Sequence, residues 1–217
     1  MNYRIIKRSD YPFLLTIDQK VYPTETPVAP KTLDEWYKND PDFGIIFEEG
    51  GKITGVLMVI PLSEKGWNGL ISGELTEADI RGDYVFDKTK DGSIGLHCYH
   101  IEKFTDGNDF YVEAYTILGH IIKRVCPAAK VLGLSGFAVT TAGISLAFNK
   151  LNLREREFIS NEHIVSKDGI LEVIENLTQE KLEQLLANGY IYHNRCKLLI
   201  TYPNEVSLVW KYMGYKK

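Results

Sequence analysis

One short segment near the middle of the chain gathers several groups that could move a proton. Residues 94–104 are rich in β-forming side chains and lie between Gly92 and Gly107, which predicts a strand. Its polar and reactive side chains are His97, Cys98, Tyr99, His100 and Glu102. A basic group whose pKa lies near neutrality suits general acid–base catalysis, so the segment predicts proton transfer. The competing interpretation is that a strand histidine is a hydrogen-bonded structural residue.

Strand geometry divides these side chains between two faces. Because successive side chains of a strand point in opposite directions, His100 and Glu102 are expected to share a face with Cys98. His97 and Tyr99 are expected on the opposite face, so the two sets should not line one pocket. The same alternation argues against a metal site made by His97 and His100, and no metal is predicted.

Hydrophobic periodicity and turn residues predict the elements that position this strand. The expected order is a strand at 3–8, a helix at 9–21, a short helix from residue 32, a hairpin at 43–62, the strand at 94–104, a helix at 109–125, a strand at 131–140 and a short helix at 141–152. Residues 63–70 look like a polar loop. In the tail, 168–176 and 178–188 have helical patterns, 195–202 predicts a strand, and 206–212 is ambiguous.

Composition and charge restrict the class of protein. The 217 residues suffice for one large domain with a substantial core. The 25 basic and 29 acidic residues give a net charge of −4 without long runs of either sign, which argues against nucleic-acid binding driven by net basicity. Three widely spaced cysteines do not indicate a disulfide framework, and neither a secretory signal nor a membrane span is predicted. We expect a cytoplasmic protein without nucleic-acid or membrane partners.

Two parts of the sequence carry a family resemblance. The apolar run 131–140, the helical segment 141–152 and the charged start of a strand at 154 form a compact unit. Upstream, residues 43–62 form a hairpin pattern around Gly50 and Gly51. In this order they resemble the acyl-CoA-binding core of the GNAT acetyltransferase superfamily, whose helix ends in a motif like that of residues 148–153.

The resemblance implies an α/β fold with a central, mixed, twisted sheet flanked by helices. It would cover residues 1–165 as a GNAT-like domain and leave 166–217 as an α/β extension packed on it. It also implies an N-acetyltransferase that moves an acetyl group from acetyl-CoA to a primary amine, on a small molecule or peptide, by direct attack in a ternary complex. The sequence leaves the oligomeric state open, and a homodimer is one possibility.

The same resemblance assigns candidate site residues. A carboxylate on the strand at 94–104 often removes the proton of the acceptor amine, which makes Glu102 the first candidate base and His100 the second. The pyrophosphate of CoA lies at the N-terminus of the following helix in this family, where backbone N–H groups hold an anion. The implied cofactor-binding residues are Ile101, Lys103, Phe104, Gly107, Asn108, Asp109, Phe110, Ala142 and Phe148.

The sequence departs from the family pattern at three places. Segment 104–111 keeps only Gly107 of the usual phosphate-loop signature, and its Asn108 or Asp109 equally suits a helix cap. Phe148 stands where the family often has the tyrosine that protonates the thiolate, and Ala142 where an asparagine contacts the cofactor. The tyrosines that remain as substitutes are Tyr99, Tyr111 and Tyr115.

These departures keep a second function open. The alternative is a catalytically silent GNAT-like module that binds a ligand or a partner protein. An aminoacyl-transferase of the same fold is a third hypothesis, disfavoured at this length. All acyl-CoA hypotheses require the strands at 94–104 and 131–140 to lie parallel and to diverge into a wedge.

Overall fold

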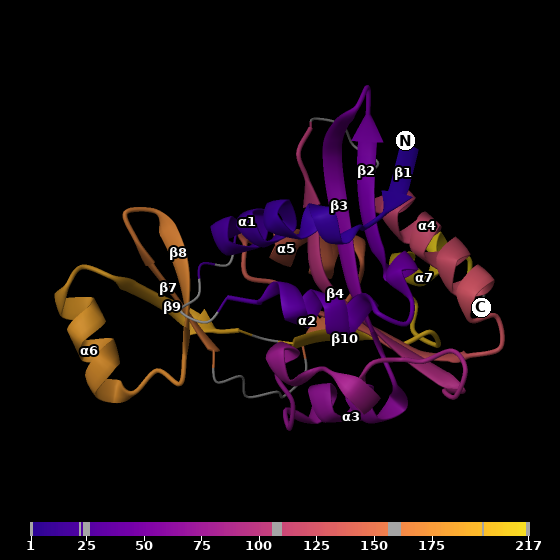
Figure 1. The fold of residues 1–217 in the computed structure, drawn as a ribbon. Helices are drawn as coiled ribbons and strands as arrows, with labels where there is room; N and C mark the ends of the chain where they lie inside the picture. Colours follow the sequence, from indigo (N-terminus) through magenta and orange to yellow (C-terminus); the bar gives the residue numbers. More distant parts are fainter. Residues whose placement is uncertain are drawn as a thin grey trace.

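The computed structural model describes residues 2–21, 23, 27–105, 110–155, 162–196 and 198–215. The main sheet comprises β1 (Asn2–Ile5), β2 (Gly44–Glu49), β3 (Lys52–Leu62), β4 (Ser93–Lys103), β5 (Lys130–Phe137), β10 (Leu198–Thr201) and β6 (Arg154–Glu155), in that spatial order. Neighbouring strands run antiparallel except β4 and β5, which are parallel. The mixed sheet with helices around it confirms the predicted fold class (Figure 1).

Helices cover both faces of this sheet (Figure 1). The helices are α1 (Tyr11–Val21), α2 (Pro30–Tyr37), α3 (Glu64–Ser72), α4 (Phe110–Val125), α5 (Thr141–Ser145), α6 (Gln179–Ala187) and α7 (Leu208–Tyr212). Trp36 of α2 packs edge-on against Tyr99 of β4, and Trp67 of α3 lies against Gly95 and Gly133 on the same face. Phe110 of α4 packs on the opposite face against Phe47. No helix among the described residues is both long and apolar enough to cross a bilayer.

A second, smaller sheet stands beside the main one. Its strands are β8 (Ile170–Glu175), β7 (Glu162–Lys167) and β9 (Ile191–Arg195), all antiparallel, with α6 following β8 in the chain. The small sheet contacts the main body through a cluster in which Val139 packs with Ile164 and Val173. The chain then returns to the main sheet as β10 and α7 (Figure 1).

The course of the tail changes the expected division of the chain. The boundary expected at 165/166 falls inside β7, and β10 of the expected extension pairs with β5 in the main sheet. Residues 162–195 therefore form an inserted unit, whereas 198–215 complete the main domain. The helix predicted at 168–176 is wrong, because Asp168 and Gly169 have positive φ and turn β7 directly into β8. The helix predicted at 178–188 is confirmed as α6.

The polar loop predicted at 63–70 is also wrong, because α3 occupies it. Ser63 caps this helix by accepting a hydrogen bond from the Gly66 N–H at 3.2 Å, and Gly73 ends it with φ of 82°. Two glycines within the segment made it look irregular. Gly66 lies directly against the backbone of Tyr84, where a side chain would collide. The helix is thus shaped by its packing partners and less by propensity.

The packing of Trp67 on the sheet gives a stability prediction. A Cβ atom added to Gly95 would lie 2.5 Å from an atom of the Trp67 ring, which is boxed in by the core. We expect Gly95→Ala to lower the free energy of unfolding by about 1–3 kcal/mol, measured by urea denaturation. Gly92→Ala, just before β4 and with nothing near the added methyl, should change it by at most about 1 kcal/mol. Equal effects of the two substitutions would contradict this packing.

Candidate functional site

The parallel strands β4 and β5 separate part-way along their length. They pair from Ser93 opposite Lys130 to Cys98 opposite Gly136. Beyond that point β4 continues to Lys103, paired with β3 on one side and with no described strand on the other. The segments 94–104 and 131–140 are therefore paired only as far as Cys98 and Gly136, and β5 ends at Phe137. Such a parting exposes one edge of β4 to any molecule that enters between the strands.

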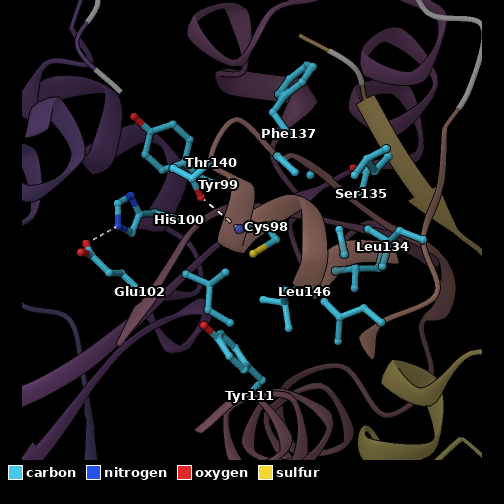
Figure 2. A pocket seen from close by; sticks show the side chains of 18 of the residues that line it. Cys98, Tyr99, His100, Glu102, Tyr111, Leu134, Ser135, Phe137, Thr140 and Leu146 are labelled. Carbon is cyan, nitrogen blue, oxygen red and sulfur yellow. Dashed lines mark hydrogen bonds and ion pairs between the residues drawn. The ribbon is translucent and has the colours of Figure 1, made fainter. Parts of the chain in front are cut away.

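A cavity of about 380 Å³ opens where the strands part. It is lined by residues 98–103 of β4, by Tyr111 and Tyr115 of α4, by residues 134–138 of β5 and its extension, and by α5 with the π-helical turn Leu146–Lys150 that follows it. Figure 2 shows His100 and Glu102 on one side of this space and Leu134 on the other. The volume is in the range of small-molecule sites.

A β-bulge in β4 shapes the polar side of the cavity. His100 lies opposite Met58 of β3 and Cys98 lies opposite Val59, so Tyr99 is an extra residue in β4. Because the bulge breaks the alternation of side chains, Tyr99 and His100 both reach helix α1. The expectation that these two residues could not line one pocket is wrong for this reason.

Asp18 of α1 is the common partner of these two residues. The Tyr99 hydroxyl donates to Asp18 Oδ2 at 2.6 Å, and His100 Nδ1 lies 3.2 Å from Asp18 Oδ1. On its other side His100 Nε2 lies 3.1 Å from Glu102 Oε2. The histidine thus bridges a buried carboxylate and one whose side chain is 33% exposed. The three side chains form what we call the carboxylate–histidine relay: Asp18, His100 and Glu102.

The two carboxylates of the relay raise the pKa of His100. Burial alone lowers the pKa of His100, but hydrogen bonds to Asp18 and Glu102, with their charges, raise it by more. The net pKa of His100 lies above its ordinary value of 6.5, which favours the imidazolium with both ring N–H groups donating. His100 thus contacts a carboxylate through each of its two ring nitrogens. Glu102 lines the cavity with a partly exposed carboxylate.

Sequence reasoning missed Asp18, although a signal was present. The predicted helix stripe contained Phe13, Leu14, Ile17 and Val21. In the structure the buried face of α1 carries Tyr11, Leu14 and Asp18, whereas Phe13 is 37% exposed. A carboxylate four residues after a buried leucine, on the core face of a helix, requires a partner inside the protein. That requirement pointed to a buried polar site.

Two tyrosines of α4 and Cys98 complete the polar lining. The Tyr115 hydroxyl donates to Cys98 Sγ at 3.8 Å. Burial raises the pKa of Tyr115 well above its usual value and that of Cys98 to about 12, so both stay protonated. Burial, with the nearby charge of Glu102, also raises the pKa of the half-buried Tyr111. Tyr111 is thus a protonated hydroxyl at the cavity, and it lies below Glu102 in Figure 2.

His97 lies outside this site. Its Nδ1 is 2.9 Å from Ser135 Oγ and its Nε2 is 2.6 Å from Glu77 Oε1, and the residue is fully buried. Its ring nitrogens are thereby satisfied, as the structural interpretation of a strand histidine expected. Among the described residues no group of three or more histidine, cysteine or acidic side chains could hold a metal ion.

The structure distributes the other expected cofactor residues unevenly. Ile101 and Lys103 line the cavity. Phe104 packs edge-on against Phe13, Phe110 is buried in the core, and Phe148 is absent from the cavity lining. Gly107, Asn108 and Asp109 lie outside the described residues, as does the side chain of Ala142.

The backbone of β4 offers donors at its open edge. The Phe104 N–H donates to Thr54 O of β3 at 2.9 Å, so this residue directs its backbone groups toward β3. Because backbone directions alternate along a strand, Ile101 and Lys103 direct theirs away from β3, into the gap. Two amides are therefore placed to pair with an extended polar molecule.

Comparisons with known proteins add a likeness of fold. No family model and no curated protein matches the chain. Arabidopsis thaliana NAA60 in complex with acetyl-CoA matches with 11% identity and a TM-score of 0.49, covering 94% of this chain and 99% of that one. The polyamine N-acetyltransferase of Drosophila melanogaster matches with 11% identity and a TM-score of 0.48, covering 93% and 99%.

A third solved structure is a GNAT-like decarboxylase, GphF, in complex with isobutyryl-CoA. It matches with 12% identity and a TM-score of 0.48, covering 69% of this chain and 72% of that one. At these identities the likeness concerns the fold alone.

The raised pKa of His100 predicts how stability depends on pH. A folded-state pKa above the unfolded value stabilises the fold fully below about 6.5, and this stabilisation is lost as the pH rises through the raised pKa. We expect the free energy of unfolding of the wild type to fall toward that of His100→Gln as the pH rises from about 6.5 through the raised pKa of His100. Urea denaturation across that range measures it. The exposed His120→Gln should retain the wild-type dependence, and a pH-independent gap between wild type and His100→Gln would contradict the relay.

Proposed function

We propose that this protein is a GNAT-type N-acyltransferase that moves an acetyl group from acetyl-CoA to a primary amine by direct attack in a ternary complex. The observation that carries the proposal is the open edge of β4 beside a cavity of about 380 Å³, next to a carboxylate–histidine relay. An extended thioester arm with amide groups fits such an edge as an additional strand would.

The backbone amides of Ile101 and Lys103 would bind the arm of acetyl-CoA. These groups point into the gap, and buried amides of a ligand need hydrogen-bond partners there. A backbone N–H near the thioester would also polarise its carbonyl oxygen, where negative charge develops as the amine attacks. Because backbone amides would bind the arm, this binding does not require the side chains that the family usually has at Ala142 and Phe148.

Glu102 accepts the proton that the amine loses as the new C–N bond forms. Its carboxylate is partly exposed and lines the cavity. His100 contacts this carboxylate with one ring nitrogen and Asp18 with the other. The relay carries a net charge of −1 when His100 is protonated, which attracts a cationic acceptor on a small molecule or a peptide. His100 and Asp18 are positioning residues in this scheme.

Tyr111 donates a proton to the sulfur that leaves as the C–S bond breaks. Phe148 has no proton to give and does not line the cavity, whereas the protonated hydroxyl of Tyr111 does. Tyr115 is occupied by Cys98, and Tyr99 by Asp18. Tyr111 is therefore the tyrosine best placed among the three named from the sequence.

The substitution Glu102→Gln tests the proposal. We expect kcat/KM for acetyl transfer to an amine to fall by about 10²–10⁴-fold, because the proton acceptor is lost. Acetyl-CoA binding, measured by calorimetry, should remain, because the thioester is held by the backbone of β4. The matched control is Glu49→Gln at the exposed end of β2, which should leave both quantities unchanged.

Three outcomes would contradict the proposal at different points. Saturating acetyl-CoA should stabilise the protein, by about 2.7 kcal/mol at one hundred times Kd, so no binding and no thermal shift would exclude an acetyl-CoA enzyme. Binding without transfer to any amine would instead favour the silent ligand-binding module. Unchanged turnover in Glu102→Gln would remove this residue from the mechanism.

A further inference from the structure

One wall of the cavity has no role in the acetyl transfer described above. On the side away from the relay, the cavity is lined by six apolar residues that we call the apolar subsite: Leu134, Leu146, Ala147, Leu151, Leu153 and Leu199. All six are at most 7% exposed. Figure 2 shows Leu134 and Leu146 across the cavity from His100 and Glu102.

The position of the subsite follows from the sheet. Leu134 precedes Gly136, the last residue of β5 paired with β4, and Leu199 of β10 lies opposite Gly136 on the other side. The subsite therefore begins where the strands part and extends under the π-helical turn that carries Leu146 and Ala147.

Neighbouring side chains already cover most of this wall, and only a small apolar part of each residue faces the cavity. Contact with an apolar group would complete the packing of that part. Ordered water is a poor occupant, because none of the six side chains can hydrogen-bond to it. An apolar ligand group is the occupant that this lining fits.

The polar arm and the acyl group of a CoA thioester differ in their need for hydrogen bonds, and this difference indicates which of them fits the apolar subsite. Its arm contains amides, which find donors at Ile101 and Lys103 but none among leucine side chains. The acyl group is the part without such needs, and an acetyl group offers only one methyl to a wall of six residues. We propose that the apolar subsite binds the acyl chain and that the preferred donor is an acyl-CoA with a chain of several carbons.

This inference rests on the proposed function and extends it from acetyl to longer acyl donors. The reaction balance is unchanged, since the amine nitrogen replaces sulfur on the carbonyl carbon whatever the chain. Glu102 still accepts the amine proton. Only the apolar contacts of the donor grow with chain length.

Calorimetric titration without an amine separates chain binding from turnover. The probes are acetyl-, butanoyl-, hexanoyl- and octanoyl-CoA below their micelle-forming concentrations. We expect Kd to fall by about four-fold for each added CH₂ group that the subsite buries, and then to level off when the chain reaches the far wall. Catalytic assays should show the same order in kcat/KM.

Two variants that change the volume of the apolar subsite in opposite directions test whether the acyl chain binds there. Ala147→Met fills the subsite and should shift the preferred chain to shorter lengths, whereas Leu146→Ala enlarges it and should shift the preference to longer ones. Because the two changes act in opposite directions, general destabilisation cannot produce both. The matched control Ala187→Met, on the exposed last residue of α6, should leave the chain preference unchanged.

The outcomes distinguish the two proposals. Equal Kd values for all four thioesters, or tightest binding of acetyl-CoA, would overturn the inference while leaving the proposed function intact. Failure of every thioester to bind would end the proposed function itself. A chain preference that neither Ala147→Met nor Leu146→Ala moves would place the acyl chain elsewhere and also overturn the inference.

Discussion

The parting of β4 from β5 is the constraint on which the rest of the site depends. Backbone N–H and C=O groups inside a protein need partners, and an unpaired strand edge leaves a row of them open. Here the edge from Ile101 to Lys103 has β3 on one side and a cavity on the other. The sheet is completed beyond the gap by β10, which the chain supplies after a long inserted unit. The opening therefore lies between two paired sets of strands, β3 with β4 and β5 with β10.

A buried carboxylate, that of Asp18, lies beside the same opening and has hydrogen-bond partners there. Asp18 is 5% exposed and would be costly alone, but the Tyr99 hydroxyl and the His100 ring satisfy its oxygens. The bulge at Tyr99 makes this arrangement reachable, because it turns two consecutive side chains of β4 toward α1. Glu102 is thereby held at the cavity by a histidine that is itself anchored. Apolar residues of β5 and β10 occupy the opposite wall, so the cavity is polar at one side and apolar at the other.

Local sequence signals predicted the elements with clear periodicity and failed where packing decides. The hairpin of β2 and β3, the strand β4 and the helix α4 followed from apolar patterns and turn glycines. Helix α3 was missed because its glycines are required by close contacts with Tyr84 and Leu75 that no local pattern reveals. In the site, Glu102 and His100 were foreseen on one strand, but Asp18 comes from a helix 82 residues before His100. The bulge that unites them depends on the pairing of β3 with β4.

Amide hydrogen exchange of β4 tests the central claim most directly. The N–H groups of Ile101 and Lys103 face the gap, whereas that of Phe104 is already bonded to Thr54. With saturating acetyl-CoA, the account predicts that exchange at Ile101 and Lys103 slows while exchange at Phe104 changes little. Unchanged exchange at both gap-facing amides, in a protein shown to bind the thioester, would contradict binding along the open edge.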